Sequence, residues 1–340
     1  MQEVVDALIC SKPGILELIK QPVGRPDPQA VLVRPRRVGI CGTDYHIFEG
    51  KHPFLLYPRI MGHELAVEVV DAPVGSGLKS GSLYSVNPYI ACGHCIACRA
   101  GKPNCCVSLS VLGVHRDGGM TGLMSLPAGN LIEAQGLTAD ECASVEFLAI
   151  GAHAVRRGTV VWGDRVLVVG AGPIGLGAAL FARLSGGNVS VLDSSPERAA
   201  VAQSLIGVSA ISSNGDPARA VADSTGGEGF NIVFDATGNE RAMEKSFDYV
   251  CNGGRYVLVG VVKAPITFMD PDFHRKEMTL YASRNATSAD FETVITAIRN
   301  KAVPIDRLIT HRTTLAEAVR DIPLWATQKS GLIKAMIEVD

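Results

Sequence analysis

A short apolar strand that runs into a glycine-rich turn places the strongest constraint on the fold of this chain. Residues 166–175 read VLVVGAGPIG, so the strand leads directly into a G-x-G-x-x-G pattern, and a helical pattern follows. In that context the first glycine allows a tight turn, the second lets a pyrophosphate approach the backbone, and the third allows close helix contact. The segment therefore predicts a dinucleotide-binding turn in a parallel sheet. Its expected cofactor-binding residues are Gly170, Gly172, Pro173, Ile174 and Gly175.

An acidic residue at the end of the next strand indicates which dinucleotide is bound. The strand VSVLD ends in Asp193, which lies 23 residues after Gly170. A carboxylate at this position accepts hydrogen bonds from ribose hydroxyls and repels a 2′-phosphate, which favours NAD over NADP. Arg198 lies close by in the sequence and could attract that phosphate. The alternative is a capped helix start that binds no nucleotide.

The pattern of apolar residues along the sequence changes at about residue 165. Before it, short apolar runs are interrupted by Gly and Pro, which is typical of a β-rich domain. After it, apolar strands alternate with helical stretches, which predicts a parallel sheet covered by helices and an α/β fold class. The expected strands are residues 166–169, 189–192, 232–235 and 256–259, and a final stretch holds expected helices at 291–300 and 315–324 and a strand at 333–339.

Four cysteines form a compact C-x2-C-x2-C-x7-C array in a turn-rich segment. They are Cys92, Cys95, Cys98 and Cys106. Four thiolates at this spacing suit one tetrahedral zinc ion and leave no open position for a substrate. A redox C-x-x-C pair is the alternative, but the surrounding Gly and Pro residues do not suit the helix that such a pair opens. Cys105, beside Cys106, is the alternative fourth ligand.

Composition narrows the classes of partner. The 340 residues carry a formal net charge of −2, with 19% charged residues, so the chain lacks the basic excess that nucleic acid or anionic lipid requires. The start, MQEVVDALIC, has no basic region typical of a secretory signal, and the uncharged stretch 166–182 is broken by glycines. Nine cysteines then indicate a reducing cytoplasm. We expect a cytoplasmic protein that acts on a small molecule, without nucleic-acid or membrane partners.

A second metal site is indicated by Cys41 in GICGTDYH, by His63 and Glu64 in GHE, and by Glu146 in VEFLAIGAH. Catalytic zinc commonly takes three protein ligands and leaves one position open, so a set of Cys, His and carboxylate fits. Each residue alone has an ordinary explanation, as a core thiol, a turn histidine or a helix N-terminal acid. Their occurrence together with the dinucleotide turn and the four cysteines favours a catalytic zinc.

These motifs together resemble the zinc-dependent medium-chain alcohol dehydrogenases, in particular the sorbitol and threonine dehydrogenase branch. The resemblance runs nearly end to end and is carried by G-I-C-G-T-D-x-H, G-H-E, the four-cysteine lobe and V-G-A-G-P-I-G. Residues 270–287 and 149–157 are similar to bacterial sugar-acid dehydrogenases of the L-galactonate type.

The resemblance implies roles for individual residues. Cys41 and His63 become catalytic zinc ligands, and Glu64 and Glu146 share the remaining protein contact. Thr43 is the hydroxyl that contacts the reacting oxygen, and His46 continues the proton path toward the cofactor ribose and solvent, with a structural turn histidine as the alternative for His46. Relatives often have Pro after the acid at position 146, whereas this chain has Phe147, so the local backbone of Glu146 is open to difference.

The resemblance also implies the architecture and the reaction. A GroES-like catalytic domain would comprise residues 1–150 and 288–340, with a structural zinc lobe at about 88–107, and a Rossmann domain would comprise 151–287, with the active cleft between them. Each subunit of a homodimer or homotetramer would hold two zinc ions and NAD, and would oxidise a polyol or sugar acid.

Substrate contacts are the least determined part of this prediction. Arg284 and Asn285 are the candidate substrate contacts, with a surface or cofactor-facing role as the alternative for Arg284. A threonine-type dehydrogenase and a non-catalytic, zinc-stabilised NAD-binding protein are the alternative functions. The non-catalytic protein would hold one zinc ion per subunit where the enzyme holds two.

Overall fold

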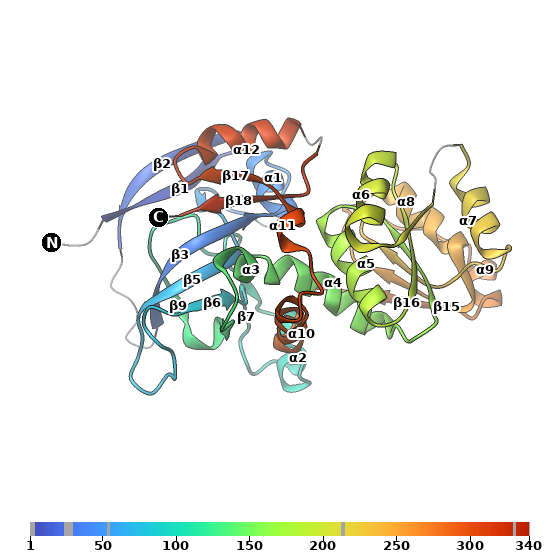
Figure 1. Ribbon diagram of the computed structural model, residues 1–340, viewed down its shortest axis with the longest axis horizontal. Coiled ribbons are helices and arrows are strands. Elements are labelled where there is room, and N and C mark those ends of the chain that lie inside the picture. The colour runs from blue at the N-terminus through green and yellow to red at the C-terminus, as the bar shows by residue number, and fades with distance from the viewer. Residues whose placement is uncertain (1–3, 24–29, 53–54, 212–214, 329–330, 340) are drawn as a thin grey trace. The chain divides into compact units, whose positions relative to one another are not determined.

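The computed structural model describes residues 4–23, 30–52, 55–211, 215–328 and 331–339. The chain divides into two compact units (Figure 1). Unit 1 comprises Met1–Glu146 and Thr287–Asp340, and unit 2 comprises Phe147–Ala286. The helix that contains the first boundary is α4 (Val145–Gly158). Unit 1 is therefore built from both ends of the sequence, and unit 2 is inserted between them.

Unit 2 is a parallel sheet whose strands are joined through helices. Its six strands lie in the order β13-β12-β11-β14-β15-β16, and every pairing between them is parallel. In chain order this is 3-2-1-4-5-6, the order of a Rossmann fold. The predicted α/β class is thus confirmed. The elements are β11 (Arg165–Val169), α5 (Pro173–Leu184), β12 (Asn188–Leu192), α6 (Pro196–Ile206), β13 (Ser209–Ile211), α7 (Pro217–Thr225), β14 (Phe230–Asp235), α8 (Glu240–Ser246), η3 (Phe247–Tyr249), β15 (Val250–Leu258), α9 (Asp270–Arg275) and β16 (Thr279–Ala282).

The glycine turn after β11 has the geometry that a dinucleotide requires. Gly170 has a φ of +96°, which other residues rarely adopt. A Cβ on Gly175 would lie 1.8 Å from the carbonyl oxygen of Gly170, so the helix could not start this close to the strand with any side chain there. At Gly172 no atom lies within 4 Å of an added Cβ, which leaves the approach to the N-terminus of α5 open. That open N-terminus suits a phosphate group.

Unit 1 is β-rich, as the punctuated apolar runs predicted. Its main sheet has the order β10-β6-β5-β3-β18-β17, with β9 paired to β3, and two smaller sheets are β2-β1-β4 and β7-β8. The strands are β1 (Val4–Lys12), β2 (Ile15–Pro22), β3 (Ala30–Ile40), β4 (Arg59–Ile60), β5 (Glu64–Asp71), β6 (Leu83–Val86), β7 (Tyr89–Ile90), β8 (Ser110–Val111), β9 (Met124–Pro127), β10 (Leu131–Glu133), β17 (Ile309–Thr314) and β18 (Lys334–Glu338). The helices are α1 (Gly42–Phe48), α2 (Ile96–Arg99), η1 (Pro103–Cys105), η2 (Ala128–Asn130), α3 (Ala139–Ala143), α10 (Ser288–Arg299), α11 (Ile305–Leu308) and α12 (Ala318–Thr327).

The register of the main sheet brings the two ends of the sequence together. In β3, Gly39 pairs with Glu64 of β5 on one side and with Met336 of β18 on the other. Apolar residues that alternate along β3 and β5 enter one core with residues of α12 and β18, including Val38 and Trp325. The central strand β3 therefore holds the segments that carry the candidate site.

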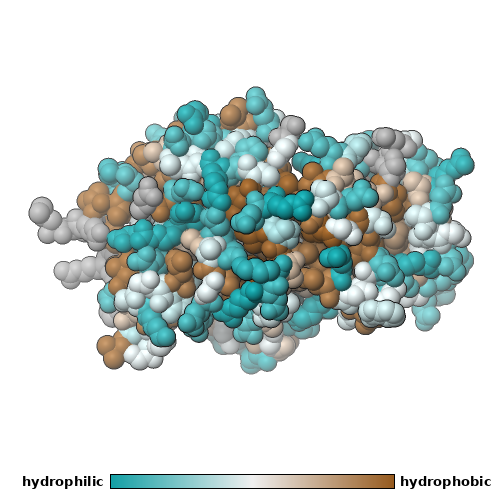
Figure 2. Space-filling view, viewed as in Figure 1, coloured by the Kyte–Doolittle hydropathy of each residue, from teal (hydrophilic) through white to brown (hydrophobic). Residues whose placement is uncertain are grey.

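Two findings bear on the environment of the protein. Among the residues that the structure describes, no helix combines the length and the apolar character needed to cross a membrane. The face seen in Figure 2 carries interspersed hydrophilic and hydrophobic residues.

Candidate metal centres and dinucleotide turn

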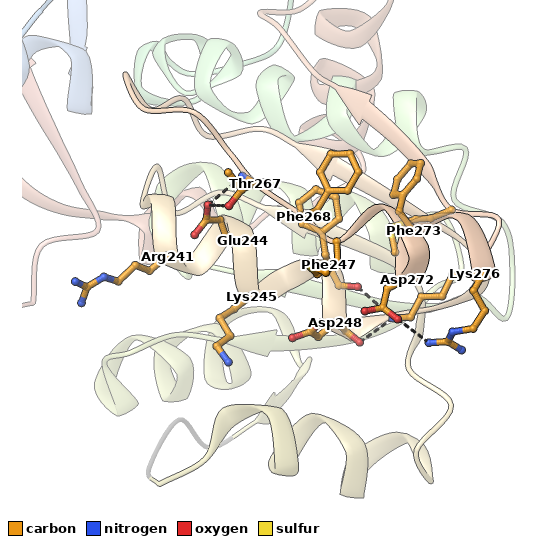
Figure 3. Close-up of a pocket in the computed structure, with 13 residues that line it drawn as sticks. Arg241, Glu244, Lys245, Phe247, Asp248, Thr267, Phe268, Asp272, Phe273 and Lys276 are labelled. Carbon is orange, nitrogen blue, oxygen red and sulfur yellow. Dashed lines mark hydrogen bonds and ion pairs between the residues drawn. The ribbon is translucent and has the colours of Figure 1, made fainter.

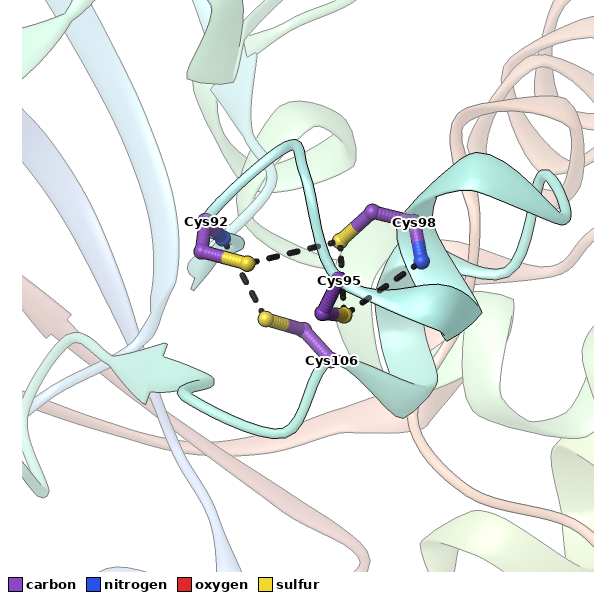
Figure 4. A group of neighbouring side chains, drawn as sticks. All are labelled: Cys92, Cys95, Cys98 and Cys106. Atoms are coloured by element: carbon purple, nitrogen blue, oxygen red, sulfur yellow. Dashed lines mark hydrogen bonds between the residues drawn. The ribbon is translucent and has the colours of Figure 1, made fainter.

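The four cysteines of the array converge on one point (Figure 4). The sulfur of Cys98 lies 3.5 Å from that of Cys95 and 4.0 Å from that of Cys92. Four sulfurs at about 2.3 Å from a zinc ion lie roughly 3.8 Å from one another, so the spacing fits one tetrahedral ion. Cys106 belongs to this group, and Cys105 is exposed outside it. Backbone N–H groups of Cys98 and Val107 lower the pKa of Cys95 to about 6, which favours the thiolate that binds metal.

A second group of metal-ligating side chains consists of Cys41, His63 and Glu64, whose ligand atoms all lie within 4.8 Å of one another. Cys41 caps the N-terminus of α1, and Glu64 is the first residue of β5, directly after His63. The imidazole of His63 hydrogen-bonds the Cys41 thiol. The structure thus brings together three of the four predicted catalytic ligands.

Asp44 supports this group from behind. It is fully buried in α1, and its carboxylate accepts hydrogen bonds from the backbone N–H groups of Cys41, at 2.8 Å, and Gly62, at 3.3 Å. One of its oxygens lies 4.0 Å from Nδ1 of His63, which has no hydrogen-bond partner among the described residues. A carboxylate behind a metal-ligating histidine orients the ring, so that the other ring nitrogen faces the metal.

Lys334, in β18, forms a buried ion pair with Glu64. Its Nζ lies 2.7 Å from both carboxylate oxygens, and the two side chains are 2% and 0% exposed. Burial acts to lower the pKa of Lys334, but Glu64 raises it overall, so the ammonium group stays charged. Gly39 makes room for the pair, because a Cβ there would lie 2.1 Å from one Glu64 oxygen.

Glu146 lies beside the three-residue group rather than within it. It is in the first turn of α4 and is 4% exposed, and its carboxylate accepts a hydrogen bond from the hydroxyl of Tyr89. Burial raises the pKa of Glu146 above its ordinary value, and the nearby charge of Glu64 adds to the rise. Burial also raises the pKa of Tyr89 well above its ordinary value, so its hydroxyl stays protonated and donates.

The charges of the site fit a divalent cation. Among the described residues, four acidic groups, Cys41, Asp44, Glu64 and Glu146, lie near two groups that can carry positive charge, the Lys334 ammonium group and the His63 imidazole. Burying so many acids without enough counter-charge is unfavourable, and a metal ion supplies the missing positive charge. A donor set of sulfur, imidazole nitrogen and carboxylate oxygen is typical of zinc.

The two residues of the predicted proton path differ in their surroundings. The hydroxyl of Thr43 lies 3.8 Å from the Cys41 sulfur, so it borders the metal site. His46 is in the last turn of α1 and is exposed to solvent. Proton transfer from Thr43 to His46 remains a prediction.

In unit 2, Asp193 is fixed at the end of β12. Its carboxylate accepts the N–H groups of Ala171 and Ser195, both at 2.7 Å, which ties it to the glycine turn. Arg198 is exposed in the first turn of α6. Arg284 and Asn285 follow β16 in the same unit, and Asn285 has a φ of +53°. Their contact with a substrate remains a prediction.

Unit 2 also contains a hollow of about 570 Å³, shown in Figure 3, whose lining includes no residue of the glycine turn. Its lining includes Phe247 and Asp248, just before β15, and Met278, just before β16. It therefore lies at the amino ends of these parallel strands. Dinucleotides bind outside the carboxyl ends, where the glycine turn follows β11, so we do not assign the cofactor to this hollow.

Comparison with known proteins identifies the family. The alcohol dehydrogenase GroES-like domain matches residues 27–136, and the zinc-binding dehydrogenase family matches residues 173–300. L-galactonate-5-dehydrogenase of Escherichia coli K12 is 40% identical over 328 residues, which are 94% of this chain and 95% of that protein. The chain is a zinc-dependent medium-chain alcohol dehydrogenase.

Other dehydrogenases are similar to this chain over nearly its whole length. L-threonine 3-dehydrogenase of Pyrococcus horikoshii is 31% identical over 325 residues, 92% of each chain. A crystal structure described as a short chain alcohol dehydrogenase (rspB) from E. coli CFT073, complexed with NADH, has a TM-score of 0.92 and 28% identity. The match covers 98% of this chain and 99% of the chain in that crystal structure. Membership of this family favours the enzyme over the non-catalytic nucleotide-binding protein.

The sequence motifs did not predict Asp44, Tyr89 or Lys334 as residues of the site. The sequence did offer a reason to examine Asp44, because it lies in the GICGTDYH segment, which also contains Cys41, Thr43 and His46. It offered none for Lys334 or Tyr89. Each is an ordinary strand residue until the fold places it against a carboxylate.

Proposed function

We propose that the protein oxidises a secondary alcohol of a polyol or sugar acid resembling L-galactonate, with NAD as the hydride acceptor. The observation that carries this proposal is the Cys41–His63–Glu64 group, in which Cys41 is half-buried and the other two residues are buried, with Lys334 behind it, in a chain of the zinc-dependent dehydrogenase family. Its 40% identity to L-galactonate-5-dehydrogenase supports the substrate class, and the NADH of a related structure together with Asp193 supports the acceptor.

We place the catalytic zinc on Cys41, His63 and Glu64, with Glu146 as the adjacent acid. When bound there, zinc acts as a Lewis acid that makes a coordinated hydroxyl more acidic. Thr43, bordering the Cys41 sulfur, would accept the proton of the substrate hydroxyl while its own hydroxyl proton passes on toward exposed His46, which exchanges a proton with solvent. Asp44 keeps the His63 ring oriented, and Lys334 limits the charge that Glu64 presents.

A substrate screen tests the proposal. NAD reduction is measured with L-galactonate and other hexonates, with hexitols and pentitols, and with L-threonine, at equal concentrations. We expect the highest kcat/KM for an aldonate or polyol. A clear preference for L-threonine would instead establish the amino-alcohol dehydrogenase, which the relatives at about 31% identity favour.

We further propose a cytoplasmic homodimer or homotetramer. The nine cysteines, of which four form a metal-type cluster, suit a reducing compartment. Sedimentation of the purified protein gives the oligomeric state, and a mass of 35.9 kDa in solution would contradict the oligomer.

A further inference from the structure

The hydrogen bond from the hydroxyl of Tyr89 to Glu146 has no part in the proposed reaction. Tyr89 is 9% exposed in the short strand β7, and its hydroxyl donates to a carboxylate oxygen of Glu146. Both partners are buried, so water competes little for this bond. A hydrogen bond to an ionised group in such a setting is stronger than one between neutral groups.

Tyr89 is itself firmly held. β7 pairs with β8 through Tyr89 and Val111, and the backbone N–H of Tyr89 donates to the side-chain oxygen of Asn87 at 3.1 Å. The side-chain amide of Asn130 donates to the carbonyl of Tyr89 at 3.3 Å. The strand then leads into the four-cysteine lobe, which begins three residues later at Cys92. The hydroxyl is therefore presented from a rigid support.

Glu146 is under competing electrostatic influences. Its buried carboxylate lies near His63 and Lys334, which can carry positive charge, and near the carboxylate of Glu64. The three ligand atoms of Cys41, His63 and Glu64 already form a group without it. A fourth protein ligand would fill the position that a substrate hydroxyl needs. The hydrogen bond from Tyr89 provides the carboxylate with a partner outside that position.

We infer that Tyr89 is a positioning residue that holds Glu146 out of the metal coordination sphere and so keeps one position open for substrate. This inference rests on the proposed function, because it takes the Cys41 site to hold zinc. Without the hydroxyl, the Glu146 carboxylate loses its partner and competes with the substrate for the metal. An internal competitor of this kind raises KM and leaves kcat at saturation unchanged.

The test compares Tyr89→Phe with the parent protein, and Tyr84→Phe serves as the matched control. Tyr84 is 5% exposed in β6 of the same unit, and its hydroxyl accepts the Lys79 N–H at 3.1 Å, away from Glu146. For each protein we measure the affinity of the Cys41 site for Zn²⁺ by competition with a chelator, and KM and kcat with L-galactonate. The visible absorption of Co²⁺ in the site reports its coordination, with Cys41→Ser as the blank for the four-cysteine site.

We expect Tyr89→Phe to bind Zn²⁺ more tightly by roughly ten- to a hundredfold, the size of a lost hydrogen bond to a charged group. KM should rise by a similar factor, and the Co²⁺ spectrum should shift toward higher coordination. In a Glu146→Gln background, Tyr89→Phe should change none of these readouts. Tyr84→Phe should match the parent.

Two outcomes would overturn the inference and leave the proposed function intact. One is unchanged metal affinity and Co²⁺ spectrum in Tyr89→Phe, and the other is a change that persists in the Glu146→Gln background. A parent protein that holds only one zinc ion per subunit would instead overturn the proposed function, and the inference with it.

Discussion

Replacing Lys334 with Met tests whether the buried ion pair with Glu64 is a necessary part of the metal site. The two side chains are 2% and 0% exposed, and both N–O distances are 2.7 Å. Lys334 also donates to the carbonyl of Ile40 at 3.3 Å. Removing one partner of a buried pair leaves the other charge uncompensated, which costs about 3–5 kcal/mol of folding free energy.

Bound metal changes the size of this loss in a specific way. A cation at Cys41 and His63 gives Glu64 a second positive partner, so the metal-loaded Lys334→Met protein should lose less stability. In a chain that also carries Cys41→Ser, which removes the metal-binding thiolate, the full loss of about 3–5 kcal/mol should appear.

The assay is urea unfolding followed by the fluorescence of Trp325. This residue is buried in α12 within the core of unit 1. The other tryptophan, Trp162, is 87% exposed in unit 2, so every protein in the assay carries Trp162→Phe to remove its signal. Lys20→Met is the control, because the Lys20–Asp6 pair is solvent-exposed and should contribute less than about 1 kcal/mol. A loss no larger for Lys334→Met than for the control, in the Cys41→Ser background, would refute the reasoning.

Three further predictions concern other parts of the molecule. Cys41→Ser should abolish NAD reduction and lower the zinc content from two ions per subunit to one, measured by elemental analysis; retained turnover would count against the assignment. Asp193→Ala should weaken NAD binding and improve relative NADP use, and an unchanged ratio of the two kcat/KM values would contradict its role. Burial alone would raise the pKa of Asp140, but hydrogen bonds from Arg312 and Arg37 lower it overall. The stability it provides is therefore fully present above pH of about 3.8 and is lost as the pH falls through the lower folded value. Asp140→Asn should thus be less stable than the parent by about 1–2 kcal/mol at neutral pH, and a urea midpoint gap that does not shrink in acid would disprove this.

Features encoded within one short segment could be predicted from the sequence. The four cysteines lie within 15 residues, and the glycine turn lies within ten, so local spacing determines what each can do. The backbone at the three glycines agrees with the pattern, since Gly170 adopts a positive φ, Gly172 has no atom within 4 Å of an added Cβ and Gly175 lies against Gly170, while the binding of a dinucleotide there stays a prediction. Cys41, His63 and Glu64 lie within 24 residues and also converge as predicted.

Features that depend on sheet register could not be predicted in this way. The contact between Glu64 and Lys334 joins residues 270 positions apart, and it exists because β18 pairs with β3 beside β5. Likewise, Tyr89 meets Glu146 across 57 positions. The sequence around Lys334 and around Tyr89 contains no motif that distinguishes either residue from any other lysine or tyrosine in a strand.

The place of Lys334 in the sequence also determines the order in which the site can form. During synthesis the ribosome releases Cys41, His63 and Glu64 early, together with the four-cysteine lobe, and then the whole of unit 2. β18 emerges after all of these, so a nascent chain can bind its structural zinc and fold unit 2 while Glu64 still has no ammonium partner. The Glu64–Lys334 pair can thus form only after β18 has emerged, later than the four-cysteine lobe and unit 2.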